Sequence, residues 1–214
     1  MSVIPAGLAD AETPVALVDL ARARANAARV AAYAERHGIA WRPHVKTHKS
    51  LALARMQLEA GARGLTVATP HEAEVMARVC DDLLLAYPLL GKRKLERLMA
   101  LPERVALTVA LDSEVAVRGL AEAARAAGRT VGVLVELDVG LGRTGVRTAR
   151  EAALLAALAR DAKGLEYRGI MFYPGHIRAH VSEQERAIGA LAERLESCCA
   201  TLAGAGLAPG RRQG

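Results

Sequence analysis

The chain has 214 residues, of which 52% are apolar, 24% are charged and 3% are aromatic. A chain of this length and composition buries a large core without disulfide staples and is not a disordered polyampholyte. No apolar run reaches the roughly 18 to 20 residues that span a bilayer, and the first residues lack the pattern of a secretory signal, so we expect a cytoplasmic protein.

The charge balance indicates an anionic ligand. The 29 Lys and Arg residues against 23 Asp and Glu residues give a net charge of +6. Such a surplus suits a nucleic acid or a phosphorylated ligand, but few aromatic side chains are present to stack on bases. The cations are also scattered along helical stretches, apart from a cluster at 42–49. We therefore predict a small anionic ligand, with neither a nucleic acid nor a membrane as partner.

In chain order, short β-rich runs alternate with longer segments of helical period. The expected strands are 15–20, 39–45, 64–68, 82–87, 104–111, 130–138 and 166–173. The expected helices are 21–37, 49–60, 70–79, 91–100, 113–127, 147–161 and 181–204. Helix C-caps are expected at Gly38, Gly61, Gly128 and Gly164, and N-terminal caps at Asp112, Ser113 and Thr148.

This alternation predicts an α/β fold with a parallel sheet and helices outside it. The strands are apolar almost throughout, which is typical of a sheet covered on both faces. An open doubly wound sheet and a closed (β/α)8 barrel both fit, and strand ends spaced about 25 residues apart favour the barrel.

The end of the chain does not complete such a barrel. After Leu207 the sequence has no β pattern, so we expect an incomplete barrel with about six of eight strands and two exposed sheet edges. A truncated or frame-shifted product would have this form. We divide the chain into an N-terminal segment with a lead-in strand (1–20), a partial barrel (21–208) and an unrelated tail (209–214).

The strongest local motif is Arg-Pro-His-Val-Lys-Thr-His-Lys at 42–49, at the carboxyl end of an expected strand, where barrel active sites lie. We expect Lys46 to point into this mouth, surrounded by Arg42, His44, His48 and Lys49. Positive neighbours disfavour a charged ammonium, and a free amine is what a Schiff-base nucleophile offers to an aldehyde. The alternative is a solvated basic loop or a nonspecific phosphate patch.

This motif resembles the cofactor-lysine motif of the D-threonine aldolase and D-serine dehydratase family, which are pyridoxal-phosphate (PLP) enzymes with an alanine-racemase-like barrel. The resemblance extends from residue 13 to about residue 208. The further segments that carry it are Thr13-Pro14, 68–74, 81–86, 136–146 (Glu-Leu-Asp-Val-Gly-x-Gly-Arg-x-Gly-Val) and 169–176 (Gly-Ile-x-x-Tyr-x-Gly-His).

The resemblance implies that Lys46 holds PLP covalently and later acts as a base at the substrate Cα. It implies that Arg143 lies close to the cofactor ring, facing its phenolic oxygen, and that Tyr173 orients the ring. His176 is implied as a contact of substrate or cofactor. The alternatives are a surface ion pair for Arg143, a core position for Tyr173 and a structural role for His176.

Two other sites are possible from the residues. Gly140-x-Gly142-x-x-Gly145 follows a strand and precedes a helix, as in a dinucleotide-binding fingerprint, but it lies late in the chain and beside Asp138. The spacings His44-x3-His48 and His176-x3-His180 could bind zinc on a helix, but neither has a third ligand. Cys80, Cys198 and Cys199 form no C-x-x-C pair and are expected to be reduced thiols, so we predict no metal ligands.

Family members of this kind are longer and have a second, β-rich domain with a His-x-Cys pair that binds a divalent metal. No such pair occurs here, and neither does the Gly/Ser-rich phosphate loop expected just after Leu207. The predicted function is a PLP-dependent lyase acting on D-3-hydroxy amino acids, by retro-aldol cleavage or by dehydration. Whether a shortened chain is active is left open. The alternatives are a PLP carrier without catalysis and an NAD-binding enzyme, and the resemblance implies a homodimer.

Overall fold

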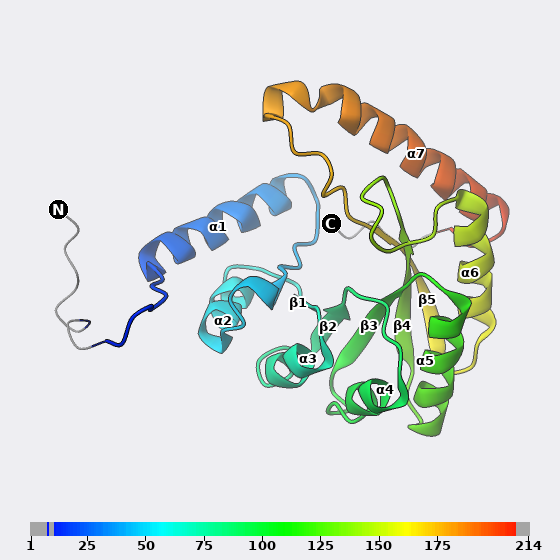
Figure 1. Cartoon of the computed structure of the whole chain (residues 1–214), viewed down its shortest axis with the longest axis horizontal. Coiled ribbons are helices and arrows are strands. Elements are labelled where there is room, and N and C mark those ends of the chain that lie inside the picture. The colour runs from blue at the N-terminus through cyan, green and yellow to red at the C-terminus, as the bar shows by residue number, and fades with distance from the viewer. Residues whose placement is uncertain (1–7, 9–10, 209–214) are drawn as a thin grey trace.

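The computed structural model describes residue 8 and residues 11–208 (Figure 1). Five parallel strands form one sheet in the order β1-β2-β3-β4-β5. The strands are β1 (Leu65–Val67), β2 (Asp82–Leu85), β3 (Ala106–Leu111), β4 (Val131–Leu137) and β5 (Leu165–Phe172). The helices are α1 (Leu20–Arg36), α2 (Leu51–Glu59), α3 (Pro70–Met76), α4 (Lys92–Met99), α5 (Glu114–Ala126), α6 (Ala149–Asp161) and α7 (Glu185–Gly204).

The strand order decides between the two predicted architectures. It follows the chain order without reversal, whereas a doubly wound sheet reverses at a switch point. The arrangement is therefore that of a partial barrel, and the predicted fold class is confirmed. Within the described residues, β5 pairs only with β4, so this edge of the sheet is open there.

The core lies between the sheet and the helices that cover its outer face. Figure 1 shows these helices, α3 to α6, around the sheet. Alternate strand residues, such as Leu83, Leu85, Val133 and Val135, are fully buried on this side. Helix α5 contributes residues such as Leu120, which is also fully buried. The period of two in the strands and of 3.6 in the helices thus brings their apolar residues into one layer.

The helix ends agree with most of the predicted caps. The Ser113 and Thr148 hydroxyls accept hydrogen bonds from the first turns of α5 and α6, and Thr148 forms a capping box with Glu151. All four predicted C-cap glycines have positive φ, for example 62° at Gly38 and 88° at Gly164. Asp112 is not the N-cap of α5, because that position belongs to Ser113.

The predicted strand 39–45 is reduced to an isolated bridge between His44 and Thr66. The Pro43 carbonyl accepts a hydrogen bond from Thr66 N at 2.8 Å, and the Trp41 carbonyl accepts one from Arg63 N at 2.9 Å. Proline has no N–H to donate in return, so this extended segment lies along β1 without becoming a full strand.

The predicted lead-in strand 15–20 is wrong for the described residues. Residues 11–19 contain no strand, and α1 already begins at Leu20, where the Asp19 carboxylate accepts a hydrogen bond from Arg22 N at 3.0 Å. No described strand lies alongside to pair with the segment, and Leu17 is 62% exposed. The predicted tail 209–214 and most of the first ten residues lie outside the described part, so the predicted domain boundaries stay predictions.

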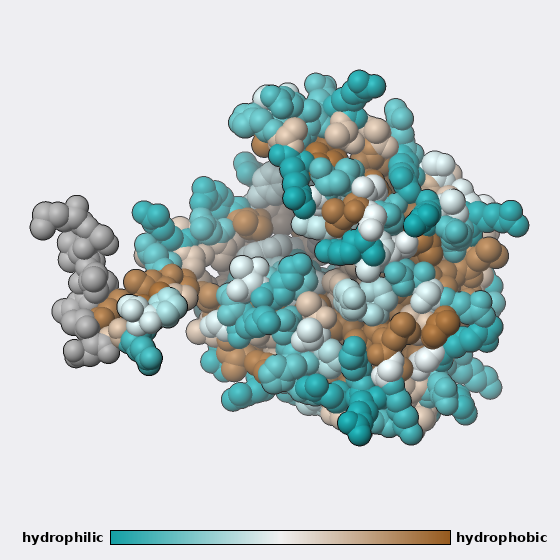
Figure 2. Space-filling view, viewed as in Figure 1, coloured by the Kyte–Doolittle hydropathy of each residue, from teal (hydrophilic) through white to brown (hydrophobic). Residues whose placement is uncertain are grey.

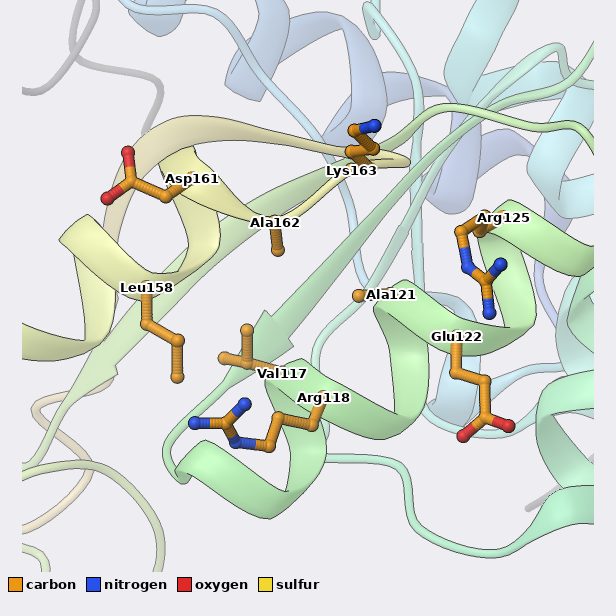
Figure 3. A pocket seen from close by; sticks show the side chains of 9 residues that line it. All are labelled: Val117, Arg118, Ala121, Glu122, Arg125, Leu158, Asp161, Ala162 and Lys163. Atoms are coloured by element: carbon orange, nitrogen blue, oxygen red, sulfur yellow. The ribbon is translucent and has the colours of Figure 1, made fainter.

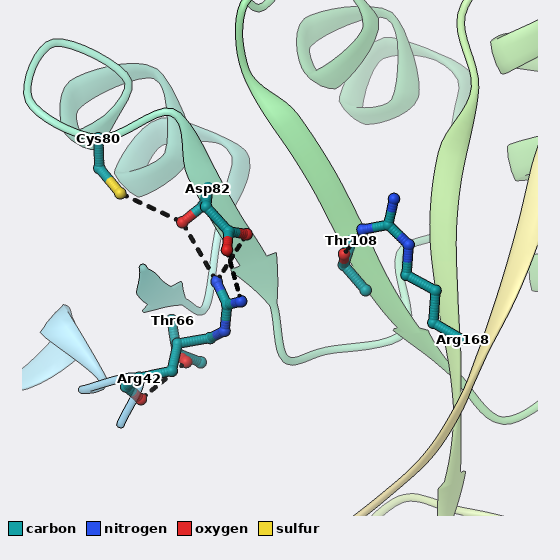
Figure 4. A network of polar contacts seen from close by, with 6 residues as sticks. All are labelled: Arg42, Thr66, Cys80, Asp82, Thr108 and Arg168. Atoms are coloured by element: carbon teal, nitrogen blue, oxygen red, sulfur yellow. Dashed lines mark hydrogen bonds and ion pairs between the residues drawn. The ribbon is translucent and has the colours of Figure 1, made fainter. Parts of the chain in front are cut away.

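The inner face of the sheet is more polar than predicted (Figure 4). Arg42 forms a two-point ion pair with Asp82 at the start of β2, at 2.8 and 2.7 Å. Farther along the sheet, Arg168 donates to the Thr108 hydroxyl at 2.8 Å. The expectation of strands that are apolar on both faces therefore holds only for the outer face.

The outer surface shows two further features. A groove between α5 and the end of α6 carries charged side chains, among them Arg118, Glu122 and Lys163 (Figure 3). None of the four predicted site residues lines it. In Figure 2, hydrophobic atoms gather where the lead-in segment and α1 project from the body. None of the helices in the described part is long and apolar enough to cross a membrane.

Candidate functional site

Lys46 lies in a short 3₁₀ helix, Val45–Thr47, directly after the bridge that joins His44 to β1. Val45 is fully buried and anchors this turn, whereas Lys46 is exposed. The Lys46 amine forms no ion pair or hydrogen bond within residues 11–208, and only its backbone N–H donates, to His44 Nδ1 at 3.3 Å. The chain therefore presents an unpaired primary amine at the carboxyl end of the sheet.

The pKa of His44, two residues before Lys46, is shifted by its surroundings. Burial, followed by the nearby charge of Lys46, lowers the pKa of His44, and Arg143 acts in the same direction while Glu72 opposes it. The imidazole is therefore neutral at physiological pH. Charges from three segments that lie far apart in the sequence, at Lys46, Glu72 and Arg143, therefore act on one imidazole ring.

Lys49, three residues after Lys46 in the motif, forms an ion pair with Glu72. Glu72, which is 5% exposed, accepts a hydrogen bond from Ala68 N at 2.8 Å, and Lys49 Nζ lies 3.4 Å from its other oxygen. Lys49 has a φ of 49°, in the left-handed region that side chains with a Cβ rarely adopt. The second lysine of the motif is thus held by an acid, unlike Lys46.

Arg143 is presented by the loop that follows β4. Asp138 Oδ1 accepts hydrogen bonds from Gly140 N at 2.9 Å and from Gly142 N at 3.1 Å, and these backbone donors lower the pKa of Asp138. The loop amides that a dinucleotide pyrophosphate would need are therefore already bound to a carboxylate of the chain. Together with the strand order, this overturns the NAD-binding alternative.

Two further carboxylates hold the same loop. Glu136, at the end of β4 and 3% exposed, accepts a hydrogen bond from the Thr144 hydroxyl at 2.8 Å. Asp112, directly after β3, accepts one from Gly145 N at 3.1 Å. Burial raises the pKa of Glu136, and its other oxygen, Oε2, has no hydrogen-bond partner in the described part of the chain.

Tyr173 and His176 follow β5 on the adjacent loop. The Arg143 guanidinium carbon lies 5.4 Å from the centre of the Tyr173 ring, which is a cation–π contact. A Cβ at Gly175 would stand 2.2 Å from that ring, and one at Gly140 would stand 2.9 Å from His176 Nε2. Both glycines therefore allow the two rings to lie close against the backbone.

The four predicted site residues thus lie on segments that follow the carboxyl ends of strands, or of the extended segment beside β1: Lys46, Arg143, Tyr173 and His176. Tyr173 is 53% exposed and is not a core residue, and Arg143 contacts Tyr173 where a surface ion pair was the alternative. Arg42 does not surround Lys46 as predicted, because its side chain turns to Asp82 at the opposite end of the sheet.

The two histidine spacings that were considered for zinc have other partners. His48 accepts from Ser50 N and pairs with Gln57, and His180 pairs with Ser182. Across the described residues, no three His, Cys, Asp or Glu side chains are grouped so that they could hold a metal ion.

Sequence reasoning missed Asp112 and Glu136 as site residues. Asp112 was interpreted as a helix cap, since an acidic residue before a helix usually has that role. Glu136 was placed only within a motif. A signal was present, because both acids directly follow or end an apolar strand, where barrel loops position catalytic groups.

Comparison with known proteins shows which family the chain resembles. The profile of "Alanine racemase, N-terminal domain" matches residues 18–212. D-threonine aldolase of Arthrobacter sp. is 35% identical over 181 residues, which cover 84% of this chain and 48% of that protein.

Solved structures give the same result. The crystal structure of D-threonine aldolase from Filomicrobium marinum is similar with a TM-score of 0.89 at 33% identity, over 94% of this chain and 56% of that one. D-threo-3-hydroxyaspartate dehydratase from Delftia sp. HT23 has a TM-score of 0.74 at 34% identity, over 91% and 51%. The chain spans about half the length of these relatives.

Proposed function

Because the chain belongs to the family of alanine racemase N-terminal domains, we propose that it binds pyridoxal 5′-phosphate through Lys46 and serves a lyase reaction on D-3-hydroxy amino acids. The observation that carries the proposal is the exposed Lys46 amine, which has no partner within the described residues and whose charge acts on His44 together with that of Arg143. The similar D-threonine aldolase and D-threo-3-hydroxyaspartate dehydratase supply the substrate class.

The residues at the mouth fit this cofactor. An aldehyde requires an accessible amine, and Lys46 is exposed and unpaired within the described residues. An anionic cofactor requires cations, and Lys46 and Arg143 both act on the neutral His44. The Arg143–Tyr173 contact offers a planar cation and a phenol at the same place.

Each residue then has a defined task. When bound, the cofactor supplies an electron sink for the charge that develops at the substrate α-carbon. Lys46 would hold the cofactor through its amine and, in the reaction, would be the group that carries the proton removed from the substrate. The Arg143 guanidinium would place a positive charge beside the cofactor ring, and the Tyr173 hydroxyl would orient that ring. His44 has a lowered pKa and therefore adds no positive charge next to Lys46.

The choice between retro-aldol cleavage and dehydration depends on which substrate bond is held perpendicular to the ring. The relatives include enzymes named for both outcomes. The proposal places no metal ligand among the described residues. We also propose a homodimer, supported by the exposed apolar side chains of the lead-in segment and α1, such as Leu17 and Tyr33 (Figure 2). Sedimentation velocity tests this point.

The test is a titration with PLP followed by borohydride reduction. We expect a visible absorption band and, after reduction, a modified peptide that contains Lys46. Lys46→Ala should abolish both signals. Lys49→Ala is the matched control, because this neighbouring lysine is already paired with Glu72, and it should retain them. Labelling that persists in Lys46→Ala would overturn the assignment.

Turnover is then measured with D-threonine and D-3-hydroxyaspartate in the presence of a divalent cation. Formation of glycine with an aldehyde indicates aldol cleavage, and formation of a keto acid with ammonia indicates dehydration. Labelling of Lys46 without either product would favour a carrier of the cofactor over a lyase.

A further inference from the structure

The Arg143 loop is fixed on both sides of the arginine. On the N-terminal side, Asp138 binds the Gly142 amide. On the C-terminal side, Glu136 binds the Thr144 hydroxyl at 2.8 Å and Asp112 binds the Gly145 amide at 3.1 Å. The acids come from the ends of two neighbouring strands, so the rigid sheet itself sets where residue 143 lies.

The backbone beyond the arginine is equally constrained. Gly145 has a φ of 106°, and a Cβ there would stand 2.4 Å from Asp138 N. Val146 N donates to the Glu136 carbonyl at 2.9 Å, and Asp138 N donates to the Val146 carbonyl at 2.9 Å. The loop therefore returns directly onto the strand from which it came, and Arg143 lies at its turn.

This arrangement is costly in electrostatic terms. Glu136 is almost fully buried, makes one side-chain hydrogen bond, and is repelled by Asp112 and Asp138. The cation that attracts it is Arg143. Burying Glu136 in this way stabilises the fold poorly. A role in holding the loop and Arg143 accounts for its position.

We propose that Glu136 and Asp112 are positioning residues for Arg143: they hold the loop 138–146 so that the guanidinium stays over the Tyr173 ring. The consequence for the cofactor rests on the function proposed above. The consequence for the loop does not, because the contacts are present in the chain alone.

The first measurement is hydrogen–deuterium exchange of the chain without cofactor. Thr144→Val removes the hydroxyl that binds Glu136 but keeps the side-chain shape, and Asp112→Ala removes the acceptor for Gly145. We expect the amides of 139–146 to exchange about tenfold faster in either variant. Thr108→Val is the control, since its hydroxyl accepts from Arg168 away from the loop and its loss should leave 139–146 unchanged. Unchanged exchange in Thr144→Val and Asp112→Ala would overturn the proposal.

The second measurement is PLP affinity in a double-mutant cycle. We expect Thr144→Val and Arg143→Ala each to weaken binding about tenfold, and the double variant to bind no worse than Arg143→Ala, because Thr144 acts through the arginine. Additive losses would mean a separate structural role and would contradict the positioning role. If the wild-type chain binds no PLP, the proposed function fails, and the exchange data still decide whether the acids hold the loop.

Discussion

Arg42 and Lys46 are four residues apart in one motif, yet they lead to opposite ends of the sheet. The Arg42 side chain is 10% exposed and is bound to both carboxylate oxygens of Asp82 at the start of β2 (Figure 4). Lys46 is exposed at the other end, and within the described residues its amine has no partner. One cation is committed to structure and the other is available for chemistry.

The two ends differ in how their polar groups are satisfied. At the amino end, Gly64 leaves the space that Arg42 fills, because a Cβ there would stand 2.2 Å from the guanidinium. At the carboxyl end, one oxygen of Glu136 has no hydrogen-bond partner among the residues that the structure describes. A closed network stabilises the fold, whereas a buried oxygen without a partner costs stability.

The largest expected effect comes from breaking the closed end. Arg42→Ala leaves Asp82 without its partner, and removing one member of a largely buried ion pair costs about 2 to 4 kcal/mol of unfolding free energy. Lys46→Ala should cost less than about 0.5 kcal/mol, because an exposed, unpaired side chain contributes little. Urea unfolding of the two variants measures both values. Equal losses would show that the two ends do not differ as described.

The next effect concerns the loop. Gly145→Ala forces a Cβ into a left-handed position 2.4 Å from Asp138 N, and strain of this kind costs about 1 to 3 kcal/mol. Gly189→Ala is the matched control in α7, where no atom lies within 4 Å, and it should stabilise the protein by about 0.5 to 1 kcal/mol. Thermal unfolding distinguishes the two. A neutral Gly145→Ala would mean that the loop does not return so closely onto β4.

Local rules in the sequence explain why much of the fold could be predicted. The period of hydrophobic residues predicts the helices and the five strands of the sheet. The chemistry of helix caps predicts the roles of Ser113, Thr148 and the four C-cap glycines. Lys46 could be placed near the strand ends because it follows an extended segment. The partner of Arg42 could not be predicted, because Asp82 is 40 residues away and reaches it only through the pairing of the strands.

The same limit applies to the site acids. Asp112 binds Gly145 across 33 residues, so a local rule assigned it to the adjacent helix. The prediction of a strand at 15–20 is wrong because a local pattern was not matched by a distant partner. Its β-favouring residues have no neighbouring strand in the described part, and Asp19 caps the start of a helix instead. Strand formation depends on a partner more than on composition.

The pH dependence of stability separates the buried acid from an exposed one. Burial raises the pKa of Glu136 above its ordinary value of 4.5, so the folded chain holds this proton more tightly than the unfolded chain. The associated stability is present below pH 4.5 and is lost as pH rises through the folded value. Glu136→Gln should therefore gain stability relative to wild type as pH rises across that window, measured by urea midpoints.

Glu151 is the control with the opposite sign. Backbone N–H groups of Arg147 and Thr148 lower the pKa of Glu151, so its contribution is present above pH 4.5 and is lost as pH falls through the folded value. Glu151→Gln should lose stability relative to wild type mainly above that window. If the stability of both variants relative to wild type changed in the same direction with pH, Glu136 would not be a buried acid with a raised pKa.

The smallest expected effect tests the two lysines of the motif against each other. Lys49 has a φ of 49°, so Lys49→Gly should be more stable than Lys49→Ala by about 1 kcal/mol, because both lose the ion pair with Glu72 and only alanine keeps the strain. At Lys46, inside a 3₁₀ turn, alanine should be the more stable of the two, since glycine there only adds freedom to the unfolded chain. Unfolding free energies of the four variants give the comparison. If glycine were not favoured at residue 49, the left-handed turn would be absent, and the Lys49–Glu72 ion pair would need another backbone geometry.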